Sequence, residues 1–332
     1  MAQFESVPVP DAQAADATAL ALGSTPLGVS LGTVNAPAVW LSACQGEVPA
    51  HAPRRPRLVV FVGENGIATR QRDGVGLSAF APEATAQQAQ QLADGLSPAA
   101  VLAGRLGVGL RTVDCPPAAA IDVENACTPE VLEEALALGA RAADEEIDAG
   151  TDFLIPGDLG VGSTTVAAVV MARLTDTEPV VIVGPGSGIT DEAWKTKVAV
   201  LRDALFRTRN LSDPLEILQV SGGPTLAALT GFIARAAARR TPLLIDSPLI
   251  TVAAVLAERL APGTRRWIYA ANTSREPAHT LALQDLGLTP LLNTLTTTGQ
   301  GLGSLFAYQL LAASLELVSD EVAAVQAATD PA

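Results

Sequence analysis

Residues 153–165 have the sequence FLIPGDLGVGSTT, and this stretch decides the fold class. Its first four residues, Phe153–Pro156, are apolar, as expected for a short strand that is buried on both faces of a parallel sheet. A glycine-rich turn follows and leads into a helical pattern at Thr164–Leu174. A strand, a tight turn and a helix in this order predict one β-α unit of an α/β protein.

The same alternation continues on both sides of this stretch. Further short apolar runs predict strands at Leu58–Val62, Leu110–Val113, Val180–Val183, Leu243–Ile245 and Trp267–Ala270. Helical patterns lie between them at Pro82–Asp94, Pro129–Ala149, Asp191–Arg207, Pro224–Arg239, Leu249–Leu260 and Glu276–Leu286. Strands that alternate with helices predict a doubly wound, mostly parallel sheet with helices on both faces.

The two ends of the chain differ from this central part. Residues 1–49 and 301–332 are helical in pattern and flank an α/β part at 50–300. We expect part of 1–35 to be a loosely held arm, and the Ala-rich ends 1–22 and 321–332 to be frayed.

Composition excludes several classes of partner. The net charge of −14 repels nucleic acid and anionic membranes, and an aromatic content of 4% is too low for an extended base-stacking surface. We find no signal peptide and no uninterrupted apolar stretch long enough to cross a membrane, so a cytoplasmic protein is expected. Cys44, Cys115 and Cys127 have no CxxC spacing, and together with two histidines they predict neither a metal site nor a cofactor.

Three glycine-rich turns follow predicted strands, at 63–66, 157–163 and 184–188. Ligands of open parallel sheets bind beyond the carboxyl ends of the strands. Glycine lets backbone N–H groups approach an anion, and a following helix N-terminus adds partial positive charge. We therefore predict a phosphate site here, with Lys197 as a mobile counter-charge. The spacing is not that of a P-loop, and a dinucleotide-binding fold stays open only as a remote alternative.

Five segments in order resemble the nicotinate-nucleotide–dimethylbenzimidazole phosphoribosyltransferases. GDLGVGSTT at 157–165 resembles the family's G-E-M-G-I-G-N-T-T signature, and SAFAPEATAQ at 78–87 resembles its S-A-[YF]-P-x-x-V-T-x-Q segment. The glycine loop and lysine at 184–197 and the short segments at 243–246 and 274–279 also match in order and spacing. The likeness runs from about Trp40 to about Ala313.

The resemblance implies a function and a set of site residues. Members of this family transfer phosphoribose from nicotinate mononucleotide to a benzimidazole nitrogen, which makes the lower-ligand nucleotide of cobalamin. A Rossmann-like sheet with a small helical lobe from both termini, and a homodimer, are implied as well. The residues expected to hold ribose and phosphate are Gly160, Gly162, Ser163, Gly186, Gly188, Lys197 and Ser274. Those expected to line the base pocket are Ser78, Phe80 and Gln87.

The chain departs from the family where the chemistry is expected. The family's late motif G-E-G-[ST]-G carries its proposed general base, but here residues 299–303 are GQGLG and the position is Gln300. An amide has no useful basicity. The proton would have to go to water or to Asp158, so we expect a slow enzyme or one with an altered acceptor.

Two other interpretations stay open at this stage. One is a non-catalytic homologue that binds a nucleotide or a base and acts as a sensor or a partner subunit. The other, from the fold alone, is an unrelated enzyme of a phosphorylated metabolite.

Overall fold

The computed structural model describes residues 4–329 and centres on a five-stranded parallel sheet. Its order is β4-β1-β5-β6-β7. The strands are β1 Pro56–Val62, β4 Gly109–Asp114, β5 Phe153–Leu159, β6 Leu243–Ile245 and β7 Ile268–Ala270. The chain passes from β1 to β4 on one side and then to β5 on the other. The order therefore reverses between β1 and β5, which is where open parallel sheets form their ligand crevice.

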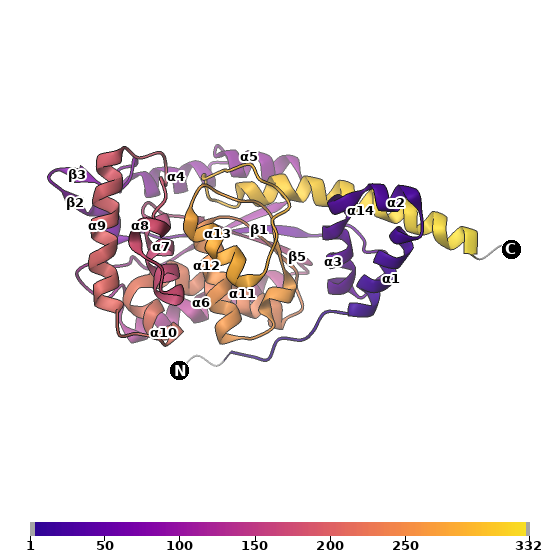
Figure 1. Cartoon of the computed structure of the whole chain (residues 1–332), viewed down its shortest axis with the longest axis horizontal. Coiled ribbons are helices and arrows are strands. Elements are labelled where there is room, and N and C mark those ends of the chain that lie inside the picture. The colour runs from indigo at the N-terminus through magenta and orange to yellow at the C-terminus, as the bar shows by residue number, and fades with distance from the viewer. Residues whose placement is uncertain (1–3, 330–332) are drawn as a thin grey trace.

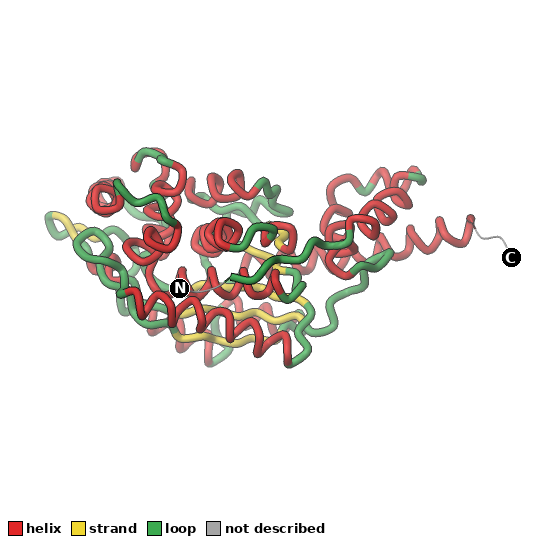
Figure 2. The backbone as a smooth tube through the Cα atoms, turned by 90° about the horizontal axis from the view of Figure 1, so that it is seen from below, coloured by secondary structure: helices red, strands yellow, loops and turns green. Residues whose placement is uncertain are grey.

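Helices cover both faces of this sheet, as predicted, and Figure 2 shows the strands lying side by side among them. Alternate residues of β1 point to opposite faces. Phe61 belongs to the core under α11 (Gly223–Ala238), where its ring lies 5.3 Å from that of Phe232. Val60 belongs to the core on the other face. The doubly wound α/β fold class is confirmed.

Apart from α5 and the short α10, which were not predicted, the remaining helices follow the predicted patterns closely. Their bounds are α4 Ala84–Ala93, α5 Pro98–Arg105, α6 Pro129–Asp148, α7 Ser163–Thr175, α9 Asp191–Thr208, α10 Pro214–Ile217, α12 Pro248–Leu260 and α13 Pro277–Leu286. A small hairpin of β2 Gln71–Arg72 and β3 Val75–Gly76 precedes α4. Helix α5, which was not predicted, begins where the Ser97 hydroxyl accepts from the Ala100 N–H.

One predicted strand is wrong. The run Val180–Val183 lies within and just after a short helix, α8 Pro179–Ile182. Pro179 takes the first helical position, where its fixed φ favours a helix and its missing N–H costs nothing. Val180 and Val181 are exposed, so the run does not lie inside the sheet.

The two ends of the chain pack together (Figure 1). Helices α1 Ala12–Gly23, α2 Pro26–Ser30 and α3 Ala36–Gln45 lie against α14 Leu302–Thr329. They form the small helical lobe that was expected, while domain boundaries at 49/50 and 300/301 stay a prediction.

The N-terminal segment is held rather than loose. The indole N–H of Trp267 donates to the Pro8 carbonyl at 2.7 Å, and Glu5 pairs with Arg235 at 2.6 Å. The two ends were expected to be frayed, but α1 is helical over Ala12–Gly23 and α14 is helical up to Thr329. Residues 1–3 and 330–332, also included in that expectation, lie outside the described part of the chain.

Two helical stretches are long and apolar enough to cross a membrane by length and composition alone. They are Pro214–Ala238, which runs from α10 through a π-helical turn at Leu218–Gly222 into α11, and Leu302–Ala328 in α14. Inside the structure, 89% of the first apolar window and 56% of the second are buried. The apolar character of the first is therefore explained by its place in the protein core.

Helices α6 and α11 pack closely because each has a glycine at the contact. A Cβ on Gly139 would lie 1.8 Å from the Ala228 carbonyl oxygen, a distance that real side chains do not reach. We expect Gly139→Ala to lower the free energy of unfolding by about 2–3 kcal/mol, because it forces two packed backbones apart. Urea unfolding measures this.

The matched control is Gly104→Ala in α5, where an added Cβ meets nothing within 4 Å. That variant should be more stable by about 0.5–1 kcal/mol, because alanine favours the helix. Equal urea midpoints for Gly139→Ala and the unaltered chain would contradict the close packing of α6 and α11.

Candidate functional site

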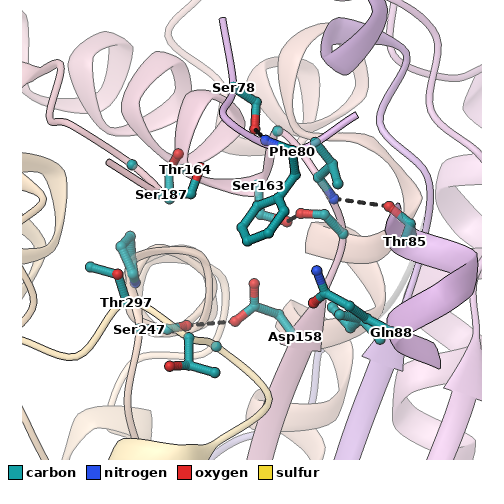
Figure 3. A pocket seen from close by; sticks show the side chains of 18 of the residues that line it. Ser78, Phe80, Thr85, Gln88, Asp158, Ser163, Thr164, Ser187, Ser247 and Thr297 are labelled. Atoms are coloured by element: carbon teal, nitrogen blue, oxygen red, sulfur yellow. Dashed lines mark hydrogen bonds between the residues drawn. The ribbon is translucent and has the colours of Figure 1, made fainter. Parts of the chain in front are cut away.

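A cavity of about 100 Å³ lies beyond the carboxyl ends of β5 and β6, beside the point where the strand order reverses (Figure 3). Its floor and walls come from the turn after β5, the turn after β6, the segment before and within α4, and the loops before α9, α13 and α14. The polar side chains on its wall are Ser78, Thr85, Gln88, Asp158, Ser163, Thr164, Ser187, Ser247, Glu276, Thr297 and Thr298.

The turn after β5 is fixed by its neighbours. A Cβ on Gly160 would lie 2.4 Å from the Gly63 carbonyl oxygen, so only glycine fits there. The Val161 N–H donates to the Thr85 hydroxyl at 3.0 Å, and the Asn65 amide donates to the Val161 carbonyl at 3.0 Å. The glycine loop after β1 thus supports the loop after β5.

Helix α7 begins at this turn and faces the cavity with its N-terminus. Its cap is Gly162, with φ +89°, so no side chain caps the first N–H groups. The Ser163 hydroxyl donates to the Gly160 carbonyl at 2.7 Å and keeps the turn closed. An uncapped helix N-terminus on a cavity wall suits an anion, as the sequence predicts for Gly160, Gly162 and Ser163.

Asp158 forms the floor of the cavity, directly below the Phe80 ring in Figure 3. One of its carboxylate oxygens accepts a hydrogen bond of 2.6 Å from the Ser247 hydroxyl. Burial raises the pKa of Asp158, and the Ser247 hydrogen bond opposes that rise. The carboxylate is therefore held in one orientation on the cavity wall.

Behind Asp158 lies a second buried carboxylate, Asp246. It accepts from the Ser247 N–H at 2.8 Å and from the Gly303 N–H at the start of α14 at 2.7 Å. Burial raises the pKa of Asp246 to about 6, although these donors favour its ionised form. Ser247 itself has φ +79° and ψ 153°, a region that is populated almost only by glycine and costs about 1–3 kcal/mol.

Lys197 is not the mobile counter-charge that was expected. Its side chain is 1% exposed, and its Nζ donates to the Thr164 hydroxyl at 3.0 Å. Nζ also lies 3.6 Å from the Glu276 carboxylate, whose other oxygen accepts from the Gly186 N–H at 2.6 Å. Burial lowers the pKa of Lys197, and Glu276 opposes that shift. A carboxylate of the chain therefore occupies the place beside Lys197 that was assigned to a phosphate.

Two further residues that were expected to contact ribose or phosphate do not lie on the cavity wall. Ser274 is buried, and both its N–H and its hydroxyl contact His279 Nδ1, at 3.2 and 3.0 Å. Burial lowers the pKa of His279 to about 4, so the ring is neutral at pH 7 and holds the turn before α13. Gly188 has φ +90° and donates its N–H to the Pro185 carbonyl, within the loop itself.

Two of the three expected base-pocket residues lie at the mouth of the cavity. Ser78 and Phe80 are on its wall, and the Phe80 ring is half exposed. Gln87 instead lines an adjoining hollow of about 470 Å³, whereas its neighbour Gln88 lines both spaces. Gln88, Ser247 and Glu276, which also lie on the cavity wall, were not among the predicted site residues.

Gln300 lies against β5 with its backbone and lines the adjoining hollow. Its N–H donates to the Asp158 carbonyl at 2.9 Å, and a Cβ on Gly157 would lie 2.9 Å from its carbonyl carbon. Its amide oxygen is buried and has no hydrogen-bond partner within residues 4–329. The carboxylates on the cavity wall are those of Asp158 and Glu276.

Comparison with known proteins decides which family this is. The family model described as phosphoribosyltransferase matches residues 7–329. A nicotinate-nucleotide–dimethylbenzimidazole phosphoribosyltransferase of Mycobacterium avium (strain 104) is 44% identical, over 99% of each chain. The chain belongs to this phosphoribosyltransferase family.

Other relatives agree. The phosphoribosyltransferase of the same name from Corynebacterium glutamicum (strain R) is 43% identical over 88% of this chain and 84% of its own length. The crystal structure of CobT from Thermus thermophilus superposes with a TM-score of 0.85 at 30% identity, covering 92% of this chain and 96% of that one. Membership of this family confirms the resemblance and overturns the interpretation as an unrelated enzyme.

The buried ion pair of Lys197 and Glu276 should contribute to the stability of the fold. Glu276→Gln leaves a buried ammonium without its counter-charge, so the free energy of unfolding should fall by about 3 kcal/mol. Urea unfolding at pH 7 measures the change. The control is the double variant Glu276→Gln with Lys197→Met, which removes both charges and should regain most of the loss. A double variant as unstable as the single one would show that the ion pair is not the cause.

Proposed function

We propose that this chain transfers phosphoribose from nicotinate mononucleotide to a benzimidazole-type base in the assembly of the cobalamin lower ligand. The observation that carries the proposal is the Asp158 carboxylate on the floor of a cavity that has the uncapped N-terminus of α7 on its wall and Phe80 at its mouth. The names of the relatives at 42–44% identity support it.

The cavity offers a place for each part of the substrates. The phosphate is assigned to the N-terminus of α7 with Gly160, Gly162 and Ser163. The acceptor base is assigned to the mouth, stacked on Phe80 and bordered by Ser78 and Gln88. The ribose would then lie above Asp158, with its reacting carbon between donor and acceptor.

The reaction exchanges one C–N bond for another. A lone pair on the acceptor nitrogen forms the new bond to ribose C1′. The bond from C1′ to the nicotinate nitrogen breaks, and its electron pair neutralises the pyridinium and frees nicotinate. The acceptor is then a cation, and its other ring nitrogen loses a proton to the Asp158 carboxylate. Because Gln300 cannot accept a proton, Asp158 is the proposed proton acceptor.

The Asp158 carboxylate also suits the charge of the transition state. Positive charge builds up on the sugar as the C–N bond stretches, and fixed negative groups nearby stabilise it. Asp158 is on the cavity wall and held by a hydrogen bond, whereas the charge of Glu276 is balanced by Lys197, so Asp158 is the group assigned this role. Most of the rate increase would then come from electrostatics and positioning, which loss of the family base leaves intact.

The proposal includes a cytoplasmic homodimer. Cys44, Cys115 and Cys127 are free thiols, in agreement with a reducing compartment. On α14, the side chains of Phe306, Leu310, Ala313 and Leu317 are exposed or half-buried and follow the 4-3-4 spacing of a coiled-coil seam. Such a stripe would pack against the same stripe of a second copy.

The test is release of nicotinate from nicotinate mononucleotide, followed by chromatography with and without dimethylbenzimidazole. We expect release that depends on dimethylbenzimidazole. If none is seen while calorimetry still detects nucleotide or base binding, the chain is the non-catalytic homologue, a sensor or a partner subunit.

The same assay on Gln300→Glu tests where the proton goes. A carboxylate at this position would face the adjoining hollow, and Asp158 already accepts the proton, so kcat should rise by about tenfold or less. A rise of about a thousandfold would show that the unaltered chain has no working proton acceptor.

A further inference from the structure

The turn from β6 into α12 does not by itself explain the backbone conformation of Ser247. Its φ of +79° with ψ of 153° is a conformation that glycine adopts easily and serine does not. A glycine here would make the same turn from β6 into α12 without strain. The strain therefore points to a role for the serine side chain that glycine could not supply.

Several groups hold Ser247 in this strained conformation. Its N–H donates to the Asp246 carboxylate at 2.8 Å, and its carbonyl accepts from the Thr251 hydroxyl at 2.8 Å. Asp246 is in turn fixed by the Gly303 N–H at 2.7 Å, where an added Cβ would lie only 2.3 Å from the carboxylate. The turn is thus anchored to the first turn of α14.

The strained backbone brings the hydroxyl to Asp158. Ser247 Oγ donates to one carboxylate oxygen of Asp158 at 2.6 Å, and Figure 3 shows this bond at the base of the cavity. The other carboxylate oxygen points up into the cavity in the same view, toward the Phe80 ring. The hydrogen bond therefore fixes which oxygen faces a bound substrate.

We infer that Ser247 is a positioning residue for the transfer reaction, which aims the free oxygen of Asp158 at the acceptor base. This inference rests on the proposed function. Ser247 touches Asp158, not the reacting atoms, so its effect on the reaction passes through that carboxylate.

Other charged groups near Asp158 bear on its protonation. Asp246 lies behind it and repels its negative charge, and Glu276 lies across the same cavity with its charge balanced by Lys197. Asp246 therefore disfavours the ionised form of Asp158, and the paired Glu276 leaves it unchanged. The Ser247 hydrogen bond favours the ionised form. Removal of the hydroxyl should therefore raise the pKa of Asp158.

The experiment compares Ser247→Ala with Ser247→Gly in the dimethylbenzimidazole-dependent assay, from pH 5 to pH 9. Both variants lose the hydroxyl, but only alanine keeps the backbone strain. In both, we expect kcat at neutral pH to fall about tenfold or more, with KM for the mononucleotide changed less than about threefold. The acid limb of the kcat profile should move up by about one pH unit in both.

The two variants separate the positioning role from a structural one. If Ser247→Gly keeps the unaltered kcat and pH profile while Ser247→Ala does not, strain is the whole effect and the inference is overturned. It is also overturned if both variants keep the profile. Absence of release by the unaltered chain would overturn the proposed function first, and this inference with it.

Discussion

The carboxylate of Asp246 is the contact on which the rest of the site depends. It lies just after β6, and its two oxygens accept from the N–H groups of Ser247 and Gly303. One bond shapes the turn into α12, and the other fixes the start of α14. The same buried group therefore joins the sheet, the cavity and the helix that carries the terminal lobe. A neutral side chain of this size could not bind both backbone donors as strongly, because hydrogen bonds to an ionised acceptor are the strong ones.

Asp246 also determines, through Ser247, how the Asp158 carboxylate is oriented. Ser247 is held so that its hydroxyl reaches Asp158, and Asp158 is left with one oxygen facing the cavity. Across the cavity, Glu276 accepts a hydrogen bond from the Gly186 N–H and forms an ion pair with Lys197. The wall thus presents the Asp158 carboxylate to the sugar and leaves the anion-binding role to the N-terminus of α7. This division suits a substrate that is anionic at its phosphate and becomes cationic at its reacting carbon.

Sequence alone predicted much of this arrangement. Strands buried on both faces are continuous apolar runs, which is why β1, β4, β5, β6 and β7 were found. The run at Val180–Val183 was wrongly predicted as a strand. Val180 and Val181 are exposed because of the fold, and the sequence of the run does not show this exposure. The glycine turns were also found, since Gly160 and Gly162 meet steric limits that no other residue meets.

The side-chain partners were harder to predict. Glu276 and Lys197 are far apart in the chain, so only the fold shows that the lysine is already paired. Gln87 was predicted, but its neighbour Gln88 lines the cavity. Both residues lie on α4, which begins at Ala84, and neighbouring residues on a helix point about 100° apart. A shift of one position therefore changes which side chain faces the cavity. Ser247 follows the predicted strand Leu243–Ile245, but its role was not predicted, since strain at a serine is visible only in the backbone angles.

The proposed mechanism depends on Asp158 as the acceptor of the proton that leaves the base. The direct test is kcat of Asp158→Asn, an isosteric change that keeps a hydrogen bond to Ser247 possible but removes the basic oxygen. We expect a fall in kcat of about 10²-fold or more and loss of the acid limb of the pH profile. A kcat within about threefold of the unaltered chain, with the acid limb still present, would contradict it.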